Sequence, residues 1–492
     1  MLTEFLEIKH PVDDIYYKIN ITEIKPLYEC KDQEGNLKLN KHVFRDVAIK
    51  IFKPLYVNET LYIYSKGVYK EVKIKYLKSI LRQMVSHTLN TSYHIDKGGY
   101  KLMTVVLKNI YLNWTEKELP QYERTKHVHG LHPYLGKFVP QLPEIFLNIY
   151  FKEGDTILDP FMGSGTTLIE ANVLGMNAIG IDISEFNCLM TKVKTDKYNI
   201  ERLEYEINDA LAKLKFFVDK LIEKEEVFQK TLFDTNIDYN DVALETDDEY
   251  IKTWYAERSI KELLAYKHII ENNNYQYKDV LKIILSRSAR SARLVKHNEL
   301  DWAKEPVREP YFCEKHKRTC YPTPEAFKFI RRYSKDTYKR IKEFSEIRKD
   351  TQIDILYMDS RIANIGKEID GIFTSPPYCG LIDYHLQHEY AYHFLDLKMQ
   401  KEKEIGPMEK GNSLKAQEAY KEGIIEVFKN CNKYLKKDGK VIIVVNDKYN
   451  LYPEIIEKSG LIEEDRVTRE VNRRTGRRST DFTEDIIICR KA

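Results

Sequence analysis

Residues 155–167 read Asp-Thr-Ile-Leu-Asp-Pro-Phe-Met-Gly-Ser-Gly-Thr-Thr, a short apolar stretch that runs into a glycine-containing turn. A helical pattern follows from about Thr166 to Leu174, and a second apolar stretch occupies residues 177–182. Strand, helix and strand at this spacing favour a parallel βαβ unit. The glycines let the backbone bend sharply and approach a ligand, with the amino terminus of the helix directly behind it. The sequence therefore predicts an α/β fold with a ligand site at this turn.

An acidic residue, Asp182, ends the second apolar stretch. A carboxylate at this position can accept hydrogen bonds from both hydroxyls of a ribose. The third glycine of the dinucleotide-binding fingerprint is missing, because Leu168 takes its place. The turn and the carboxylate together fit a nucleoside-containing cofactor, and a tight turn without a ligand is the alternative for the turn alone.

The pattern of apolar and charged residues divides the 492 residues into four segments. Apolar strands return at residues 371–374, 440–445 and 485–489, after a long stretch rich in charge and in helix-forming residues. We expect a strand-rich amino-terminal domain over 1–120, the first part of the sheet domain over 121–190, a helical insert over 191–350 and the second part of the sheet domain over 351–492. Residues 17–22 and 71–76 alternate as strands do, and Ser65-Lys66-Gly67 favours a hairpin turn between strands. Nothing in the amino-terminal segment indicates its role.

A second loop follows the apolar strand at 371–374 and reads Ser375-Pro376-Pro377-Tyr378. Two successive prolines have no amide donors and cannot continue a central strand, so the loop is expected to be rigid. Its backbone presents carbonyl oxygens, the serine adds a hydroxyl acceptor, and the tyrosine offers a flat aromatic face. Such a loop suits the amino group of a planar heterocycle, and a proline-rich turn is the alternative.

With both loops on what reads as one sheet, the chain resembles the S-adenosylmethionine-dependent amino-methyltransferases of DNA. The glycine motif of that family reads D-P-F-x-G-S-G-T and its catalytic motif S/N/D-P-P-Y, and this chain meets both at every position. The match covers roughly residues 125–190 and 350–492. The resemblance implies a Rossmann-like methyltransferase fold, with a mainly parallel seven-stranded sheet whose last strand is antiparallel.

The same resemblance implies S-adenosylmethionine as the cofactor. It places Lys137 and Phe138 at the methionine end of the cofactor pocket and Asp359 near the adenine amino group. An ordinary loop before a helix is the alternative for the first two, and an exposed loop aspartate for the third. The other cofactor contacts that it implies are Asp159, Phe161, Gly163, Ser164, Gly165, Thr166 and Asp182.

The order of the motifs, with the cofactor motifs first and the catalytic loop last, resembles the alpha class of this family, in which the intervening segment commonly carries target recognition. Ser-Pro-Pro-Tyr is most often associated with the N4 amino group of cytosine, and Asp- or Asn-Pro-Pro-Tyr with N6 of adenine. We therefore favour cytosine, with adenine as the alternative. The resemblance makes Ser375, Pro376, Pro377 and Tyr378 the catalytic residues. Cys379 lies next to them, but methylation of an amino group needs no covalent nucleophile.

Two groups of arginines are candidates for contact with double-stranded DNA. One recurs every third residue in a helix predicted over 282–296, and the other flanks Thr475-Gly476 in a predicted hairpin. Solvated surface is the alternative for both groups. The residues are Arg287, Arg290 and Arg293 in the helix and Arg473, Arg474, Arg477 and Arg478 in the hairpin.

Cysteine and histidine residues give little reason to expect a metal. Cys313, His316 and Cys320 offer three soft ligands without an evident fourth at tetrahedral zinc spacing. His127, His129 and His132 precede the glycine turn, which favours packing or a role at the cofactor site. We therefore expect no metal site.

The composition narrows the class of protein. Lysine and arginine total 79 against 76 aspartate and glutamate, a net charge of +3, so any nucleic-acid contact is local rather than spread over a basic coat. The chain lacks a run of about 18 apolar residues and begins without a secretory signal, and its seven cysteines do not suggest a disulfide framework, so we expect a cytoplasmic protein. An RNA or protein amino-methyltransferase and a non-catalytic DNA-binding protein remain alternatives. A cognate restriction endonuclease is a possible partner, and the oligomeric state is open.

Overall fold

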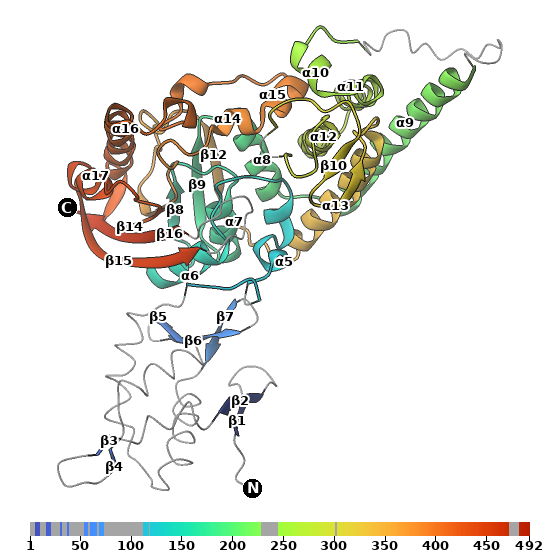
Figure 1. Cartoon of the computed structure of the whole chain (residues 1–492). Helices are drawn as coiled ribbons and strands as arrows, with labels where there is room; N and C mark the ends of the chain where they lie inside the picture. The colour runs from blue at the N-terminus through green and yellow to red at the C-terminus, as the bar shows by residue number, and fades with distance from the viewer. Residues whose placement is uncertain are drawn as a thin grey trace. The chain divides into compact units, whose positions relative to one another are not determined.

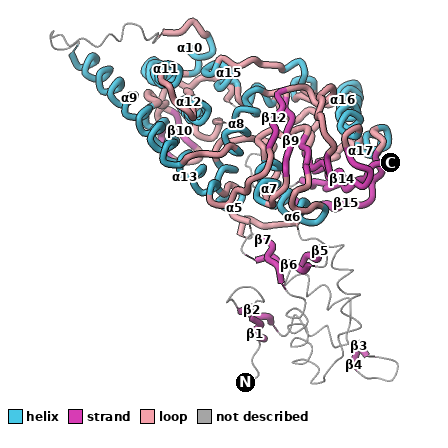
Figure 2. The backbone as a smooth tube through the Cα atoms, turned by 180° about the vertical axis from the view of Figure 1, so that it is seen from behind, coloured by secondary structure: helices cyan, strands magenta, loops and turns pink. Residues whose placement is uncertain are grey.

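The computed structural model describes residues 112–117, 119–227, 245–300, 303–471 and 482–492, together with seven short amino-terminal strands (Figures 1 and 2). The chain divides into two compact units. The first comprises Met1–Glu123, Asn148–Tyr150 and Val467–Thr483, and the second Arg124–Leu147, Phe151–Arg466 and Glu484–Ala492.

The amino-terminal strands form antiparallel pairs. They are β1 (Phe5–Lys9) with β2 (Tyr16–Asn20), β3 (Cys30–Lys31) with β4 (Leu37–Lys38), and a three-stranded sheet of β5 (Pro54–Val57), β6 (Thr60–Ser65) and β7 (Val68–Val72). Ser65 pairs with Val68, so the hairpin predicted around residues 65–67 is present. Of the strand predicted over 71–76, Glu71 and Val72 belong to β7, and residues 73–76 lie outside the described residues.

A seven-stranded sheet forms the centre of the second unit, in the order β12-β9-β8-β13-β14-β16-β15. The first five strands in this order run parallel to their neighbours, and β16 runs antiparallel to β14. This confirms the predicted mainly parallel sheet with an antiparallel last strand. The strands are β8 (Thr156–Asp159), β9 (Asn177–Asp182), β12 (Ile353–Tyr357), β13 (Ile369–Thr374), β14 (Leu435–Val445), β15 (Leu461–Val471) and β16 (Phe482–Lys491).

Helices cover both faces of this sheet (Figure 1). On one face, α16 (Leu414–Asn432) and α17 (Tyr452–Lys458) share a core with strand residues such as Ile181 and Ile372. On the other, α7 (Thr166–Val173) and α8 (Glu185–Thr195) follow β8 and β9. Gly180 makes room there: a Cβ on it would stand 2.8 Å from Leu168 of α7. The βαβ unit predicted from residues 155–182 is therefore present.

The insert is mostly helical, as its composition predicts. It contains α9 (Ile200–Val227), α10 (Glu249–Trp254), α11 (Glu257–Asn272), α12 (Lys278–Ala292), a hairpin of β10 (Tyr311–Cys313) and β11 (Arg318–Cys320), and α13 (Phe327–Ser345). Helix α12 packs against α8, α11, α13 and α15 (Glu389–Leu395). The helix predicted over 282–296 is α12, which begins at Lys278 and ends at Ala292. It ends before residue 296 because the backbone is extended at Arg293.

Short helices complete the described part of the chain. They are α5 (Gln121–Arg124), η2 (His127–Gly130), α6 (Gln141–Tyr150), α14 (Tyr384–Gln387), η4 (Lys401–Lys403) and η5 (Met408–Lys410). Within the described part of the chain, no helix has the length and apolar character needed to cross a bilayer. The six cysteines whose side chains are described, at positions 188, 313, 320, 379, 431 and 489, are free thiols.

Candidate active site

The glycine turn and the Pro-Pro loop emerge side by side from neighbouring strands. Strands β8 and β13 are parallel partners, with Ile157 opposite Gly371 and Leu158 opposite Ile372. The chain continues from β8 to β9 on one side and from β13 to β14 on the other, so the strand order reverses between them. Ligands of open α/β sheets bind at such a reversal, beyond the carboxyl ends of the strands.

Asp159, at the end of β8, is hydrogen-bonded to residues next to both loops. Its carboxylate accepts hydrogen bonds from the Phe161 amide (3.1 Å), the Thr167 hydroxyl (2.7 Å) and the Thr374 hydroxyl (2.7 Å), and only 1% of the residue is exposed. Burial raises the pKa of Asp159 to about 6, although these hydrogen bonds act against the shift. The Asp159 carboxylate thus positions the two loops, and Asp159 is not among the residues that line the cavity described below, so its predicted cofactor contact stays a prediction.

We expect Thr374→Val to destabilise the protein, because the buried carboxylate of Asp159 then loses one of its donors. A hydrogen bond to a charged group contributes about 1.5–3 kcal/mol. Scanning calorimetry should show a lower Tm for this variant. The matched control is Thr156→Val, at the half-buried start of β8, which should change Tm little. Equal shifts in both variants would contradict the role given to Asp159.

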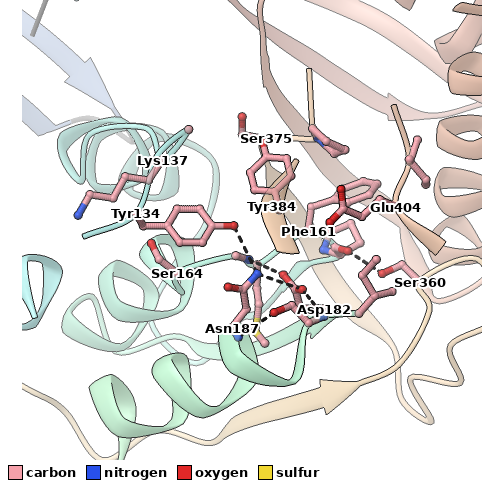
Figure 3. Close-up of a pocket in the computed structure, with 18 of the residues that line it drawn as sticks. Tyr134, Lys137, Phe161, Ser164, Asp182, Asn187, Ser360, Ser375, Tyr384 and Glu404 are labelled. Carbon is pink, nitrogen blue, oxygen red and sulfur yellow. Dashed lines mark hydrogen bonds between the residues drawn. The ribbon is translucent and has the colours of Figure 1, made fainter. Parts of the chain in front are cut away.

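A cavity of about 870 Å³, its open mouth included, lies above the two loops (Figure 3). Most of the residues predicted to contact cofactor or substrate line it: Lys137, Phe138, Phe161, Gly163, Ser164, Thr166, Asp182, Asp359, Ser375 and Pro377. Asp159, Gly165, Pro376 and Tyr378 do not. The structure therefore brings residues from both loops to one cavity.

Helix α8 packs against the glycine turn and binds its carbonyl groups. Gly165 has φ +76°, and a Cβ there would stand 2.6 Å from Thr191 of α8. The buried ammonium of Lys194 donates to the Ser164 carbonyl (2.7 Å), and the Thr191 hydroxyl donates to the Gly163 carbonyl (3.2 Å). With its carbonyls bound to α8, the turn leaves the amino terminus of α7 next to the cavity, a location that favours anionic groups.

Asp182 is a hydrogen-bonding centre at the end of β9. Its carboxylate accepts from the amides of Gly163 (2.9 Å) and Ser184 (2.8 Å) and from Asn187 Nδ2 (3.2 Å). Burial raises its pKa to about 6 against these hydrogen bonds. Asn187 also lines the cavity, and its Oδ1 is buried without a hydrogen-bond partner. This end of the cavity therefore combines a carboxylate with an unpaired acceptor.

The predicted wall residues have mixed outcomes. The Lys137 ammonium donates to the His129 carbonyl (2.6 Å), and Figure 3 shows its side chain leading away from Asp182. Burial, with the charge of Arg340, lowers the pKa of Lys137 to about 8. The Phe138 ring meets Phe373 edge-on at 5.6 Å. Thus Lys137 borders the cavity, but its ammonium is engaged by the protein.

Asp359 follows β12 and lines the cavity. Its carboxylate forms a two-pronged ion pair with Arg361, with Nη2 at 2.6 Å from Oδ2 and Nε at 3.0 Å from Oδ1. Burial raises the pKa of Asp359, but the hydrogen bonds and charge of Arg361 outweigh it, and the pKa lies below its usual value. Asp359 is therefore an ionised acceptor at the cavity.

The lining residues that sequence patterns missed include Tyr134, Tyr384, His385 and Glu404. The rings of Tyr134 and Tyr384 stack at 6.1 Å, and the Tyr134 hydroxyl accepts a hydrogen bond from Asn187 Nδ2 (3.4 Å), as Figure 3 shows. His385 Nδ1 is hydrogen-bonded to Glu404, which also accepts from the His385 amide, while His385 Nε2 is buried without a partner. The aromatic residues that follow Tyr378 in the sequence are a local signal for Tyr384 and His385, but not for Tyr134 or Glu404.

Of the two hydroxyl-bearing residues in the Pro-Pro loop, Ser375 lines the cavity. Tyr378 instead donates its hydroxyl to Glu484 Oε1 of β16 (3.1 Å), and burial, with the charge of Glu484, raises its pKa. Burial also raises the pKa of the Cys379 thiol, which keeps it protonated and a poor nucleophile. Of this loop, Ser375 and Pro377 are the residues that border the cavity.

The arginines of α12 do not form the predicted basic strip. Arg287 is buried, donates to Thr337 (2.8 Å) and Asp336 (2.5 Å) of α13, and lies over the Tyr333 ring. Arg293 is also buried, 4.9 Å from the centre of the Tyr390 ring. Their DNA contacts are therefore corrected to structural roles, which leaves the half-buried Arg290. Arg473, Arg474, Arg477 and Arg478 lie outside the described residues.

Of the three histidines before the glycine turn, His129 and His132 have polar partners, whereas both ring nitrogens of His127 are buried without a hydrogen-bond partner. His129 Nε2 lies 2.6 Å from Glu170 Oε1. His132 bridges the Pro133 carbonyl (2.8 Å) and the Ser286 hydroxyl (3.1 Å). These contacts fit the packing role that their position favoured.

Comparison with known proteins gives consistent relatives. A family model described as DNA methylase matches residues 14–193. Type II methyltransferase M.MjaII of Methanocaldococcus jannaschii is 43% identical over 429 residues, covering 75% of this chain and 81% of that protein. Type II methyltransferase M.BsoBI of Geobacillus stearothermophilus is 28% identical, covering 59% of this chain and 57% of that protein.

A tRNA (guanine(10)-N2)-dimethyltransferase of M. jannaschii is 28% identical over 193 residues, covering 38% of this chain and 50% of that protein. Among solved structures, the rRNA methyltransferase aviRa of Streptomyces viridochromogenes covers 73% of this chain and 88% of that chain, with 11% identity and a TM-score of 0.27. That structural similarity is too weak to bear on the fold.

Proposed function

Because this chain belongs to the type II DNA methyltransferases, a family that uses S-adenosylmethionine, we propose that it methylates the N4 amino group of cytosine in double-stranded DNA. One observation carries the proposal: Ser375, which opens the Ser-Pro-Pro-Tyr loop, borders the same cavity as the glycine turn and Asp182. Neither the fold nor the relatives distinguish cytosine N4 from adenine N6. The preference for cytosine rests on the serine of that loop.

The cavity fits the cofactor in its donor and acceptor groups. Asp182 offers a carboxylate to ribose hydroxyls, and Asp359 offers one to an adenine amino group. Asn187 Oδ1 and His385 Nε2 are buried polar atoms that still lack partners. S-adenosylmethionine supplies a methyl group on a positively charged sulfur. These residues would orient that methyl group towards Ser375.

The substrate amino group needs help from the protein, because its lone pair is delocalised into the ring. In this proposal the target base is flipped out of the duplex, which costs a few kcal/mol. The Ser375 hydroxyl and the Pro376 carbonyl accept hydrogen bonds from the amino protons and aim the lone pair at the methyl group. Tyr378, which is held by Glu484 and does not line the cavity, is proposed to pack against the flipped base beside it. The nitrogen would gain the methyl group as the methyl–sulfur bond breaks, and it would release one proton to solvent. Positioning therefore supplies most of the rate enhancement.

We expect the affinity for S-adenosylmethionine to fall in mild acid. Asp182 has a pKa of about 6 in the cofactor-free protein, and ribose hydroxyls bind its ionised form. Binding therefore expels the proton that Asp182 carries at low pH, and the affinity should be constant above about pH 7 and drop roughly tenfold at about pH 5. Titration calorimetry across this range measures it. Asp182→Asn should flatten the profile, and an unchanged pH dependence in that variant would contradict this role.

The proposed function is tested with cofactor that carries a labelled methyl group and with separate pools of DNA and RNA. Mass spectrometry of the digested nucleosides should find N4-methylcytosine in DNA. Label only as N6-methyladenine would overturn the cytosine assignment. Label only in RNA would overturn DNA as substrate and favour the activity named for the tRNA methyltransferase relative. No transfer to either pool, with intact cofactor binding, would favour a DNA-binding protein without catalysis.

The type II relatives also suggest a setting for this activity. We propose that the protein acts in the cytoplasm and protects DNA from a restriction endonuclease that reads the same sequence. Plasmid DNA methylated by the purified protein should resist such an endonuclease, and unmethylated plasmid should be cut. Cleavage of both would count against this partnership while leaving the methylation itself untouched.

A further inference from the structure

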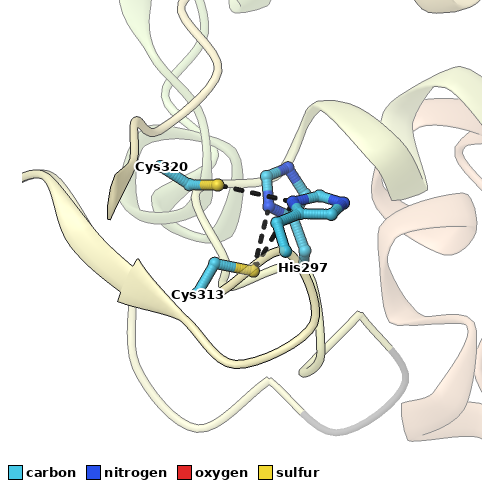
Figure 4. A group of neighbouring side chains, drawn as sticks. His297, Cys313 and Cys320 are labelled. Atoms are coloured by element: carbon cyan, nitrogen blue, oxygen red, sulfur yellow. Dashed lines mark hydrogen bonds between the residues drawn. The ribbon is translucent and has the colours of Figure 1, made fainter. Parts of the chain in front are cut away.

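Four side chains with soft ligand atoms gather in the insert: His297, Cys313, His316 and Cys320 (Figure 4). None of them lines the cavity of the candidate active site. Their ligand atoms all lie within 4.8 Å of one another. We propose that these residues form a structural zinc site, which is independent of the proposed methylation.

The separations between the ligand atoms suit one tetrahedral ion. His316 Nδ1 lies 3.4 Å from Cys320 Sγ and 3.6 Å from Cys313 Sγ, and His297 Nδ1 lies 3.7 Å from Cys313 Sγ. Zinc bonds of about 2.3 Å to sulfur and about 2.0–2.1 Å to nitrogen, at the tetrahedral angle, place sulfur and nitrogen about 3.6 Å apart. Two thiolates and two imidazoles in this geometry favour zinc over metals that prefer oxygen ligands.

A tight turn brings three of the ligands together. Cys313 ends β10 and pairs with Arg318, while Cys320 ends β11 and pairs with Tyr311. Between them, the amides of His316 (3.1 Å) and Lys317 (2.7 Å) both donate to the Cys313 carbonyl. Lys317 adopts the left-handed region, with φ +52°, which closes the turn. The turn thereby places the His316 ring between the two sulfurs.

The fourth ligand comes from the chain just after α12, which explains why local spacing did not reveal it. The backbone amide of His297 donates to the Tyr311 hydroxyl (3.1 Å), and that hydroxyl also lies 3.0 Å from His297 Nδ1. The rings of His297 and His316 meet edge-on at 4.7 Å. The bond from the His297 amide to Tyr311 therefore holds His297 beside the hairpin. Zinc would take the Nδ1 lone pair that now faces the Tyr311 hydroxyl, and it would join the hairpin to the end of α12.

The hairpin has little else to stabilise it. Its strands are three residues each, and an isolated two-stranded hairpin is at best marginally stable in water. Phe312 is 59% exposed and Tyr321 is 71% exposed, whereas the two cysteines are buried. Burial is thus concentrated on the ligand sulfurs, as expected where a metal replaces a hydrophobic core.

A second group, His127, His129 and Glu170, is also close enough to share an ion. There the ammonium of Lys126 already lies 3.5 Å from Glu170 Oε2, and His129 is hydrogen-bonded to Oε1 of the same residue. A protein cation therefore already neutralises that carboxylate. The group in the insert instead offers four ligand atoms, two of them thiols that become thiolates on binding zinc, which is why it is preferred.

Metal analysis of the full-length protein tests the proposal without any assay of methylation. The protein is first incubated with equimolar zinc and then dialysed against metal-free buffer. Inductively coupled plasma mass spectrometry should then find about one zinc ion per chain. Cobalt substituted for zinc should give the visible absorption of a tetrahedral site with thiolate ligands. Removal of zinc by a chelator should lower Tm.

Cys313→Ser, Cys320→Ser and His297→Ala should each lose most of the bound zinc. Cys431→Ser, at a buried cysteine of α16, and His268→Ala, on α11, are the matched controls and should keep it. A wild-type protein that retains no zinc or cobalt overturns the proposal even if the variants fail to fold. Zinc retained in full by all three ligand variants, or a Cys313–Cys320 disulfide in unreduced wild-type protein, also overturns it.

Discussion

Replacing Ser375 with alanine is expected to lower the rate of methyl transfer by about 100- to 1000-fold, the loss typical of removing one positioned hydrogen-bonding group from an active site. Ser375 borders the cavity, whereas Tyr378 directs its hydroxyl to Glu484. The variant therefore loses the side-chain acceptor proposed to hold the amino protons. Affinity for S-adenosylmethionine should remain nearly unchanged, because Asp182 and the glycine turn are intact.

Single-turnover measurements with saturating DNA separate this loss from product release, and titration calorimetry reports cofactor binding. Ser345→Ala is the matched control: this serine ends α13, and its hydroxyl donates to the Lys342 carbonyl. The control should transfer methyl groups at the wild-type rate. A Ser375→Ala enzyme with undiminished transfer, or one that loses cofactor binding in proportion, would show that the hydroxyl does not act on the amino group.

Sequence patterns predicted the two loops well, because each loop is encoded locally. The glycines at 163 and 165 adopt positive φ, and the prolines at 376 and 377 end a strand, so their geometry follows from their own residue types. Both loops follow short apolar strands, so the sequence also predicted that they lie at the same edge of one sheet. Asp182 was found for the same reason, since it ends a recognisable strand.

Contacts between distant segments were beyond local patterns. Tyr134 and Tyr384 stack although 250 positions separate them, and only the sheet topology brings them to one cavity. The spacing of arginines on α12 predicted a shared face but not what covers it: Arg287 meets Asp336 on another helix. His297 was missed as a fourth ligand for the same reason. The side of an element that faces the interior is decided by its neighbours.

Replacing Asp182 with alanine is expected to weaken the binding of S-adenosylmethionine by about 10- to 100-fold. Hydrogen bonds to a charged group contribute about 1.5–3 kcal/mol, and the carboxylate is proposed to accept them from the ribose hydroxyls. The effect should fall on cofactor affinity, and transfer at saturating cofactor should change less. Titration calorimetry and single-turnover kinetics measure the two quantities separately. Asp219→Ala, at an exposed aspartate of α9, should leave both unchanged.

A structural role would also weaken binding, because Asp182 anchors the amides of Gly163 and Ser184. A cofactor analogue that lacks both ribose hydroxyls distinguishes the two roles through a double-mutant cycle. If Asp182 binds the ribose, the wild-type protein prefers the natural cofactor and the Asp182→Ala variant loses most of that preference. An alanine variant that keeps the full preference, while binding both compounds more weakly, would show that Asp182 only supports the glycine turn. Ser375→Ala should lower the rate of methyl transfer and leave cofactor affinity unchanged, whereas Asp182→Ala should lower cofactor affinity and change the transfer rate less. This pair of results would place the reacting group and the ribose of the cofactor at opposite ends of one cavity.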